Sequence, residues 1–260
     1  TRDTLSDLLE IQIVAFPQSG LLCRPGTAEL LDQALREGAD VLGGLDPQAI
    51  DGDAAASLDV LFALAERHAR PLDIHLHESG EQGASTLQLI LDRVEALGMQ
   101  GRVAISHCFC LGDVEAAQRD RLLARMARLR VAVITTGTAS RPVPQLSACR
   151  AAGVLVAGGN DGIRDTWTPY GQPDMLERAM LIGLRNNLRR DDEIGWALST
   201  VTADAASVCG FADYGLAPGC RADFVLVQAQ TVAEAVVARP PRQCVVARGR
   251  VVAREGRLVA

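Results

Sequence analysis

Apolar residues gather in six short runs over the first part of the chain, and the segments between the runs place apolar side chains at helical spacing. The runs are residues 11–16, 39–45, 72–74, 103–105, 131–135 and 154–157. The helical segments include residues 29–38, 57–69, 85–97 and 113–129. Strands that alternate with helices about every 30 residues indicate parallel βαβ units. The pattern predicts an α/β fold of the (β/α)8 TIM-barrel type, incomplete, with about six of its eight βα units present.

The pattern changes after the sixth run. Residues 174–188, 192–199 and 203–209 have helical spacing, and short strands follow at residues 222–227, 243–247 and 250–254. Thr27 is a candidate helix N-cap, Gly98 a candidate helix end, and Gly249 and Gly256 suit tight turns between the last strands. We expect two domains: a partial barrel over residues 1–210 and a small β segment over residues 211–260.

Composition narrows the functional classes. Of 260 residues, 48% are hydrophobic and 22% are charged, which is typical of a globular protein. The 26 basic residues are all arginine and are scattered, and the net charge is −6, so a nucleic-acid partner has little support. The apolar runs are shorter than the about 20 residues that span a bilayer, and residues 1–10 do not resemble a signal peptide. The seven cysteines, without a C-x-x-C pair, indicate reduced thiols in a cytoplasmic protein.

Candidate chemistry lies where the predicted strands end, because barrel enzymes place their active sites at the carboxyl ends of the strands. Three of the four histidines lie there: His75, His77 and His107 follow the third and fourth runs. His68 lies instead at the end of a predicted helix. Packing alone does not explain this distribution, so we interpret it as a site.

Two carboxylates lie at the same predicted edge. Asp161 ends the sixth run, and Glu78 lies three residues past His75. Imidazole and carboxylate ligands suit zinc or iron(II), and a carboxylate beside the metal can move protons without being a ligand. The residues predict one divalent metal ion. A phosphate-binding barrel is a weaker interpretation, because Asn160 and Asp161 directly follow the Gly158-Gly159 pair and would repel an anion.

At these positions the sequence resembles the amidohydrolase superfamily and, within it, bacterial cytosine deaminases. The resemblance runs along the whole chain and is most specific at the strand ends. Its motifs are Ile11-Gln12-Ile13-Val14-Ala15-Phe16-Pro17-Gln18, Gly38-Ala39-Asp40-Val41, Asp73-Ile74-His75 with Glu78, Ser106-His107, Asp161 with Asp165, Trp167, Pro169 and Gly171, and Tyr214-Gly215-Leu216 with Gly219 and Ala222-Asp223.

The resemblance implies roles for three residues in catalysis. His75 is then the third metal-binding histidine, on strand five of a complete barrel. Asp161 is the metal-binding aspartate of strand eight and takes a proton from the bound water. Glu78 carries protons between that water, the ring nitrogen and the leaving amine. The implied reaction is attack of metal-bound hydroxide on the amino-bearing ring carbon, followed by loss of ammonia.

The resemblance also implies a substrate pocket. His107 then stabilises the attacking hydroxide or the developing oxyanion, Gln18 bonds the amide edge of the ring, and Trp167 lines the pocket. Gln18 could also be a turn residue after Pro17, and Trp167 is equally well explained by packing. His77 is expected to lie outside the first shell, pointing away from the ligand His75. The implied partner is a small N-heterocyclic molecule, and a homo-oligomer is left open.

The chain departs from this family at its start and beside Asp161. No His-x-His pair precedes Gln18, so we expect that an N-terminal portion with the first two strands and two metal-binding histidines is missing. Gly162 and Asn160 stand where cytosine deaminases have aspartate and histidine. Cytosine, isocytosine and a triazine therefore all remain candidate substrates. The alternative of a different class is a non-catalytic fragment or pseudoenzyme of the same fold.

Overall fold

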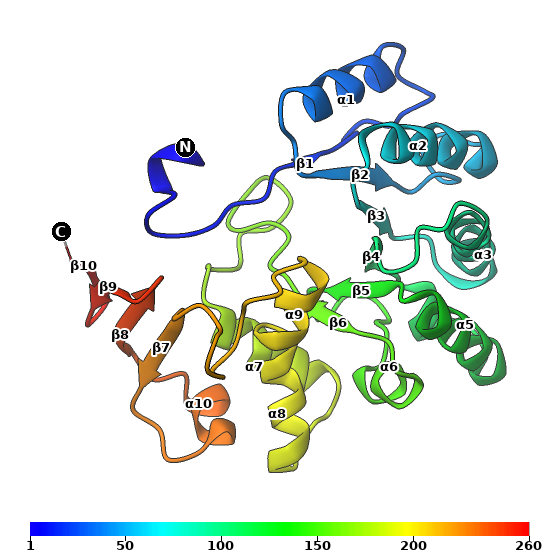
Figure 1. Ribbon diagram of the computed structural model, residues 1–260. Helices are drawn as coiled ribbons and strands as arrows, with labels where there is room; N and C mark the ends of the chain where they lie inside the picture. Colours follow the sequence, from blue (N-terminus) through cyan, green and yellow to red (C-terminus); the bar gives the residue numbers. More distant parts are fainter. Residues whose placement is uncertain (260) are drawn as a thin grey trace. The chain divides into compact units, whose positions relative to one another are not determined.

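A sheet of six parallel strands organises the computed structural model, which describes residues 1–259 (Figure 1). The strands lie side by side in chain order, each separated from the next by helical or loop segments, as in the successive βα units of a barrel. The fold class predicted from the sequence is thereby confirmed, and each apolar run overlaps a strand. The strands are β1 (Val14–Ala15), β2 (Val41–Leu45), β3 (Leu72–Leu76), β4 (Val103–His107), β5 (Ala132–Thr135) and β6 (Val156–Gly158).

The two faces of β3 differ in burial. Ile74 and Leu76 are fully buried, whereas His75 between them is half-buried. Side chains alternate between the faces of a strand, so the apolar ones share one face. On that face Ile74 and Leu61 crowd Gly44, where a Cβ would lie 2.7 Å from the Leu61 side chain. The sheet therefore packs on its helices through one face and directs His75 to the other.

The helices that connect these strands lie along one side of the sheet (Figure 1). Thr27 is the first residue of its helix and not the predicted cap, because Gly26 precedes it in a left-handed conformation with φ of 88°. The helix predicted at residues 113–129 begins only at Ala116, because Val114 is extended and separates it from the short helix that ends at Asp113. The helices are α1 (Thr27–Arg36), α2 (Ala54–His68), α3 (Gly80–Ala96), α4 (Cys110–Asp113), α5 (Ala116–Leu129) and α6 (Leu146–Ala152), and the last was not predicted.

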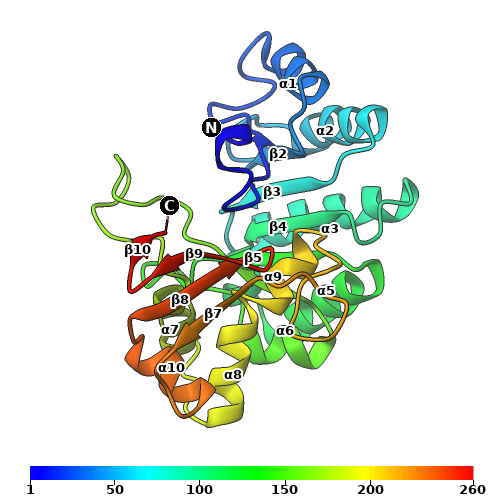
Figure 2. The same cartoon turned by 60° about the vertical axis from the view of Figure 1, so that its left-hand side comes forward.

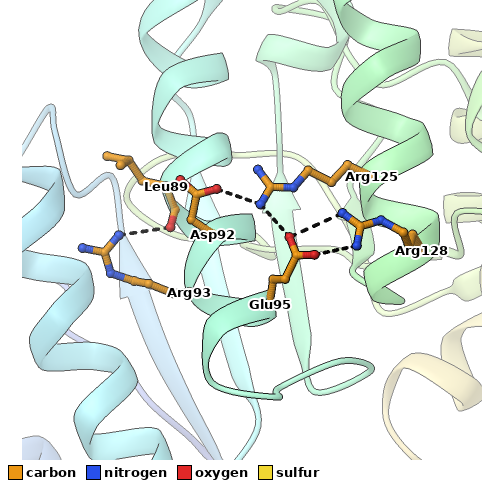
Figure 3. A network of polar contacts seen from close by, with 6 residues as sticks. All are labelled: Leu89, Asp92, Arg93, Glu95, Arg125 and Arg128. Atoms are coloured by element: carbon orange, nitrogen blue, oxygen red, sulfur yellow. Dashed lines mark hydrogen bonds and ion pairs between the residues drawn. The ribbon is translucent and has the colours of Figure 1, made fainter.

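Arginine ion pairs join α3 to α5 on the surface (Figure 3). Arg125 contacts Asp92 at 2.7 Å and Glu95 at 3.1 Å, and Arg128 contacts Glu95 at 2.5 Å. The hydrogen bond from Arg128, followed by that from Arg125, lowers the pKa of Glu95. These exposed pairs are screened by solvent, so they align the two helices more than they stabilise the fold.

The chain divides into two compact units, residues 12–156 and residues 1–11 together with 157–260. The second unit contains a four-stranded antiparallel sheet in the order β10-β9-β8-β7, drawn in orange and red in Figure 2. Its strands are β7 (Phe224–Val227), β8 (Arg242–Ala247), β9 (Arg250–Arg254) and β10 (Arg257–Leu258). Its helices are η1 (Asp3–Leu5), α7 (Met175–Arg185), α8 (Asp191–Ser199), α9 (Ala203–Val208) and α10 (Val232–Ala238).

Turns of the second unit match the sequence expectation. Gly249 and Gly256 adopt positive φ of 76° and 75° between the last strands. The antiparallel sheet falls within the predicted segment 211–260, although the division at residue 210 stays a prediction. Every helix within residues 1–259 is too short or too polar to cross a bilayer.

Candidate active site

Three histidines meet at the carboxyl ends of β3 and β4. The register of these parallel strands pairs Leu76 with His107 and so brings the residues around them together. Their ring nitrogens lie within 4.8 Å of one another, and we call His75, His77 and His107 the histidine cluster. The ring of His77 stacks on that of His107 with centroids 4.1 Å apart, and the rings of His75 and His107 are 5.0 Å apart.

The position of His77 corrects one expectation. His77 lies two residues beyond His75, and an extended chain returns to the same face after two residues. Its ring therefore joins the cluster, and the prediction that it points away was wrong.

The environment of His107 favours neutral imidazole. Burial lowers the pKa of His107 to about 3, and the neighbouring His77 and His75 rings act in the same direction against Asp46. A neutral ring can bind a metal ion or accept a proton. His107 also has a φ of 68°, and the following Cys108 a φ of 48°. Non-glycine residues rarely adopt this conformation, and such positions cluster at functional sites.

Glu78 lies beside the cluster, with its carboxylate held by the protein. One oxygen, Oε1, accepts hydrogen bonds from the backbone N–H groups of Gln48 at 2.8 Å and Ala49 at 3.0 Å. The other, Oε2, accepts one from the Thr86 hydroxyl. The side chain is buried. These bonds fix the carboxylate in one orientation, and its role as a proton carrier stays a prediction.

Gln18 lines a cavity of about 370 Å³ between the end of β1 and α1. Leu30 and Leu31 of α1 line the same cavity, so its helical wall is apolar. Phe16 lines it too and contacts His75, with ring centroids 4.7 Å apart. Phe16 thus lines the cavity that Gln18 lines and also contacts His75 of the histidine cluster.

Asp161 and Trp167 belong to the other compact unit. Asp161 follows β6 and has a φ of 62°, another left-handed position at a strand end. Arg178 donates to the side chain of Asn160 at 3.0 Å. Burial lowers the pKa of Arg178, while Glu177 and Asp161 act in the opposite direction. Trp167 is 79% exposed on a loop. The roles predicted for Asp161 and Trp167 stay predictions.

Asp46 is a site residue that the sequence analysis missed. It directly follows β2, is buried, and contacts His77 through both oxygens of its carboxylate. The signal available in the sequence was an aspartate at the end of a strand, as for Asp161.

The family model of the amidohydrolase family matches residues 2–260 of the chain. The chain belongs to the amidohydrolase family. The resemblance noted at the strand ends is thereby confirmed.

Solved structures resemble this amidohydrolase along nearly its whole length. The N-isopropylammelide isopropylaminohydrolase of Burkholderia multivorans ATCC 17616 is 65% identical, with a TM-score of 0.98, over 99% of this chain and 66% of that one. The 5-methylcytosine deaminase of Klebsiella pneumoniae with bound phosphonocytosine is 25% identical, with a TM-score of 0.88, over 100% of this chain and 67% of that one.

A curated relative is matched over a similar share of its own length. The N-isopropylammelide isopropyl amidohydrolase of Pseudomonas sp. (strain ADP) is 28% identical over 100% of this chain and 64% of its own length. The amidohydrolase chain described here therefore spans about two thirds of the proteins that it matches.

The residues of this amidohydrolase fit a divalent metal ion. The histidine cluster offers three imidazole groups within a small space, and imidazole suits zinc, copper, iron and nickel. The low pKa of His107 leaves its ring neutral, so the ring can donate or accept a hydrogen bond beside the ion. The donor set does not distinguish among these metals.

Gly162 has a structural reason in this amidohydrolase. A Cβ at Gly162 would lie 2.0 Å from Oδ2 of Asp165. Asp165 is itself held in place, because its Oδ1 accepts from the backbone N–H groups of Trp167 at 2.9 Å and Thr168 at 3.0 Å. An aspartate at position 162, as in cytosine deaminases, would have to displace the Asp165 carboxylate.

Proposed function

We propose that the protein containing this chain is a metal-dependent hydrolase that removes an amine or ammonia from an N-heterocycle, and that a triazine such as N-isopropylammelide is preferred over cytosine. The observation that carries the proposal is the 65% identity to an N-isopropylammelide isopropylaminohydrolase, against 25% to a 5-methylcytosine deaminase. Gly162 also supports a triazine over cytosine. A second aspartate at this position, as in cytosine deaminases, would lie where the Asp165 carboxylate now is.

In this proposal His75 and Asp161 would be ligands of the metal ion. When bound, a divalent metal ion supplies Lewis-acid activation of water. His107, neutral because burial lowers its pKa to about 3, hydrogen-bonds the reacting oxygen. Glu78 would carry the protons of the attacking water, one at a time, first to the ring nitrogen and then to the leaving amine. Gln18 would hydrogen-bond the amide edge of the ring, and Trp167 would line the substrate pocket.

The test uses the complete protein that contains this chain, since the chain spans about two thirds of its relatives. Release of isopropylamine from N-isopropylammelide and of ammonia from cytosine are measured side by side as kcat/KM. We expect the triazine to be the better substrate by at least about 100-fold, as expected where pocket hydrogen bonds differ. Equal or better turnover of cytosine would refute the substrate class.

The assignment of Glu78 is tested with Glu78→Gln, which we expect to abolish turnover. Exposed Glu66 on α2 provides the control, Glu66→Gln, with unchanged kcat. Undiminished turnover in Glu78→Gln would remove Glu78 from the mechanism without affecting the substrate assignment.

A further inference from the structure

The loop of residues 162–171, between β6 and α7, is closed by its own hydrogen bonds. The backbone N–H of Arg164 donates to the carbonyl of Tyr170 at 3.1 Å, and Nε of Arg164 donates to the carbonyl of Gly171 at 3.2 Å. A Cβ at Gly171 would lie 3.4 Å from the carbonyl oxygen of Gly162. The two ends of this loop therefore lie side by side, and the whole loop belongs to one compact unit.

Asp165 holds the middle of the loop. Its backbone N–H donates to the carbonyl of Thr168 at 3.0 Å. Its Oδ1 accepts from the backbone N–H groups of Trp167 at 2.9 Å and Thr168 at 3.0 Å. An aspartate that accepts from the backbone two and three residues further on fixes a turn. Asp165 therefore sets the direction in which the side chain of Trp167 leaves the backbone.

Gly162 leaves room for the Asp165 carboxylate. A Cβ at position 162 would lie 2.0 Å from Oδ2 of Asp165 and 2.8 Å from its Cγ. Gly162 has no positive φ, so its lack of a side chain provides space and does not serve a left-handed backbone. The carboxylate is thus confined between Gly162 on one side and the two backbone N–H groups on the other.

The loop carries two exposed aromatic side chains. Trp167 and Tyr170 are each 79% exposed. The chain has only two tryptophans and two tyrosines, so one of each lies on this loop. Tryptophan and tyrosine offer a large contact area with few rotatable bonds, and a fixed backbone lowers the entropic cost of binding further. Such a loop is suited to contact an aromatic ligand.

We propose that Asp165 is a positioning residue that holds this loop in the conformation that presents Trp167 to the heterocyclic substrate. The inference rests on the proposed function, in which Trp167 would line the substrate pocket. Asp165 acts on substrate binding through Trp167, so its removal should matter only while Trp167 is present.

The experiment is a double-mutant cycle in the complete protein, measured as KM and kcat with the heterocycle that is turned over best. We expect Trp167→Ala to raise KM about 10- to 100-fold with little change in kcat, since the ring contact exists before and during the reaction. Asp165→Ala should raise KM about 10-fold, and the double variant should be no worse than Trp167→Ala. Additive effects, or no effect of Trp167→Ala, would overturn the proposal.

Two further variants separate positioning from stability. Asp165→Asn keeps an oxygen that can accept from both backbone N–H groups, so its KM should stay at the wild-type value. Thr231→Ala is the matched control, because the Thr231 hydroxyl accepts from the backbone N–H of Glu234 at 3.1 Å at the start of α10, in the same unit. It removes a bond of the same kind and should leave KM unchanged. A rise in KM as large as that in Asp165→Ala would reduce Asp165 to a structural role.

A second measurement does not depend on turnover. In the complete protein labelled with fluorotryptophan, the fluorine NMR resonance that is absent from Trp167→Phe belongs to Trp167. We expect Asp165→Ala to shift this resonance, and Asp165→Asn and Thr231→Ala to leave it in place. An unchanged resonance in Asp165→Ala would contradict the positioning role. Absence of turnover by the wild-type protein would refute the proposed function, whereas the fluorine resonance tests the hold of Asp165 on Trp167 by itself.

Discussion

Replacement of Glu78 by leucine removes the acceptor of three hydrogen bonds from one place in the fold. The two backbone donors, on Gln48 and Ala49, belong to exposed residues, so water can satisfy them at a net cost of about 1 kcal/mol each. The third donor, Thr86, is 2% exposed, and leaving its hydroxyl without an acceptor costs about 1 to 3 kcal/mol. We therefore expect Glu78→Leu to lower the free energy of unfolding by about 3 to 5 kcal/mol.

The isosteric Glu78→Gln variant should behave differently. Its amide oxygen can still accept from both backbone N–H groups, and its amide nitrogen can donate to the Thr86 hydroxyl, so the loss should be about 1 kcal/mol. This difference makes Glu78→Gln suitable for the turnover test, because the variant folds. Glu66→Leu on exposed α2 is the control for the leucine variant and should change stability by less than about 0.5 kcal/mol.

Urea denaturation followed by far-UV circular dichroism measures these free energies. Both tryptophans, Trp167 and Trp196, lie in the unit that includes residues 157–260, so their fluorescence reports that unit while circular dichroism reports both. Glu78 lies in the unit of residues 12–156, and its variants should shift the dichroism signal. If Glu78→Leu were no less stable than Glu66→Leu, the three hydrogen bonds would not contribute as argued.

Three further predictions concern other parts of the chain. Gly83→Ala should destabilise the protein by more than about 2 kcal/mol, because the new Cβ would lie 2.0 Å from a backbone oxygen. Gly195→Ala, inside α8 with open space around it, should instead stabilise the protein by about 0.5 to 1 kcal/mol. Thermal unfolding compares the two variants. Although burial opposes it, hydrogen bonds from a serine hydroxyl and three backbone N–H groups lower the pKa of Asp51. The stabilisation is therefore fully present above the ordinary pKa of aspartate and is lost as the pH falls through the lowered pKa. Urea titrations should find that Asp51→Asn loses more stability relative to wild type at about pH 7 than at acidic pH. Burial raises the pKa of Cys149 to about 12. Iodoacetamide at about pH 8 should therefore label exposed Cys23 and spare Cys149, as checked by peptide mass spectrometry. Rapid labelling of Cys149 would contradict its burial.

The strands were predictable because their apolar runs are local signals. Leu72, Ile74 and Val103 lie in runs too short for helices and flanked by amphipathic segments, which leaves a buried parallel strand as the consistent interpretation. The seven residues of α6 give about two turns, too few to establish a period, so that helix could not be found in this way. The break at Val114 depends on one residue in an extended conformation and has no counterpart in the apolar pattern.

The site was predictable in part for a related reason. His75 and His107 were placed together because the carboxyl ends of neighbouring parallel strands meet at one edge of a sheet. The contact between Asp46 and His77 joins residues 31 positions apart and depends on the register of β2 against β3, which no local pattern contains. The same limit applies to the bonds that hold Glu78.

The hydrogen bonds of Asp46 and Glu78 cross between the same two loops in opposite directions. Asp46, on the loop after β2, binds His77 on the loop after β3, and Glu78 on that second loop binds Gln48 and Ala49 on the first. Most of these donors are backbone N–H groups, so exchange of one loop for a loop with a different backbone course would leave the carboxylate on the other loop without its donors. For recombination, and for any effort to alter this chain by grafting, the two loops form a single transferable part.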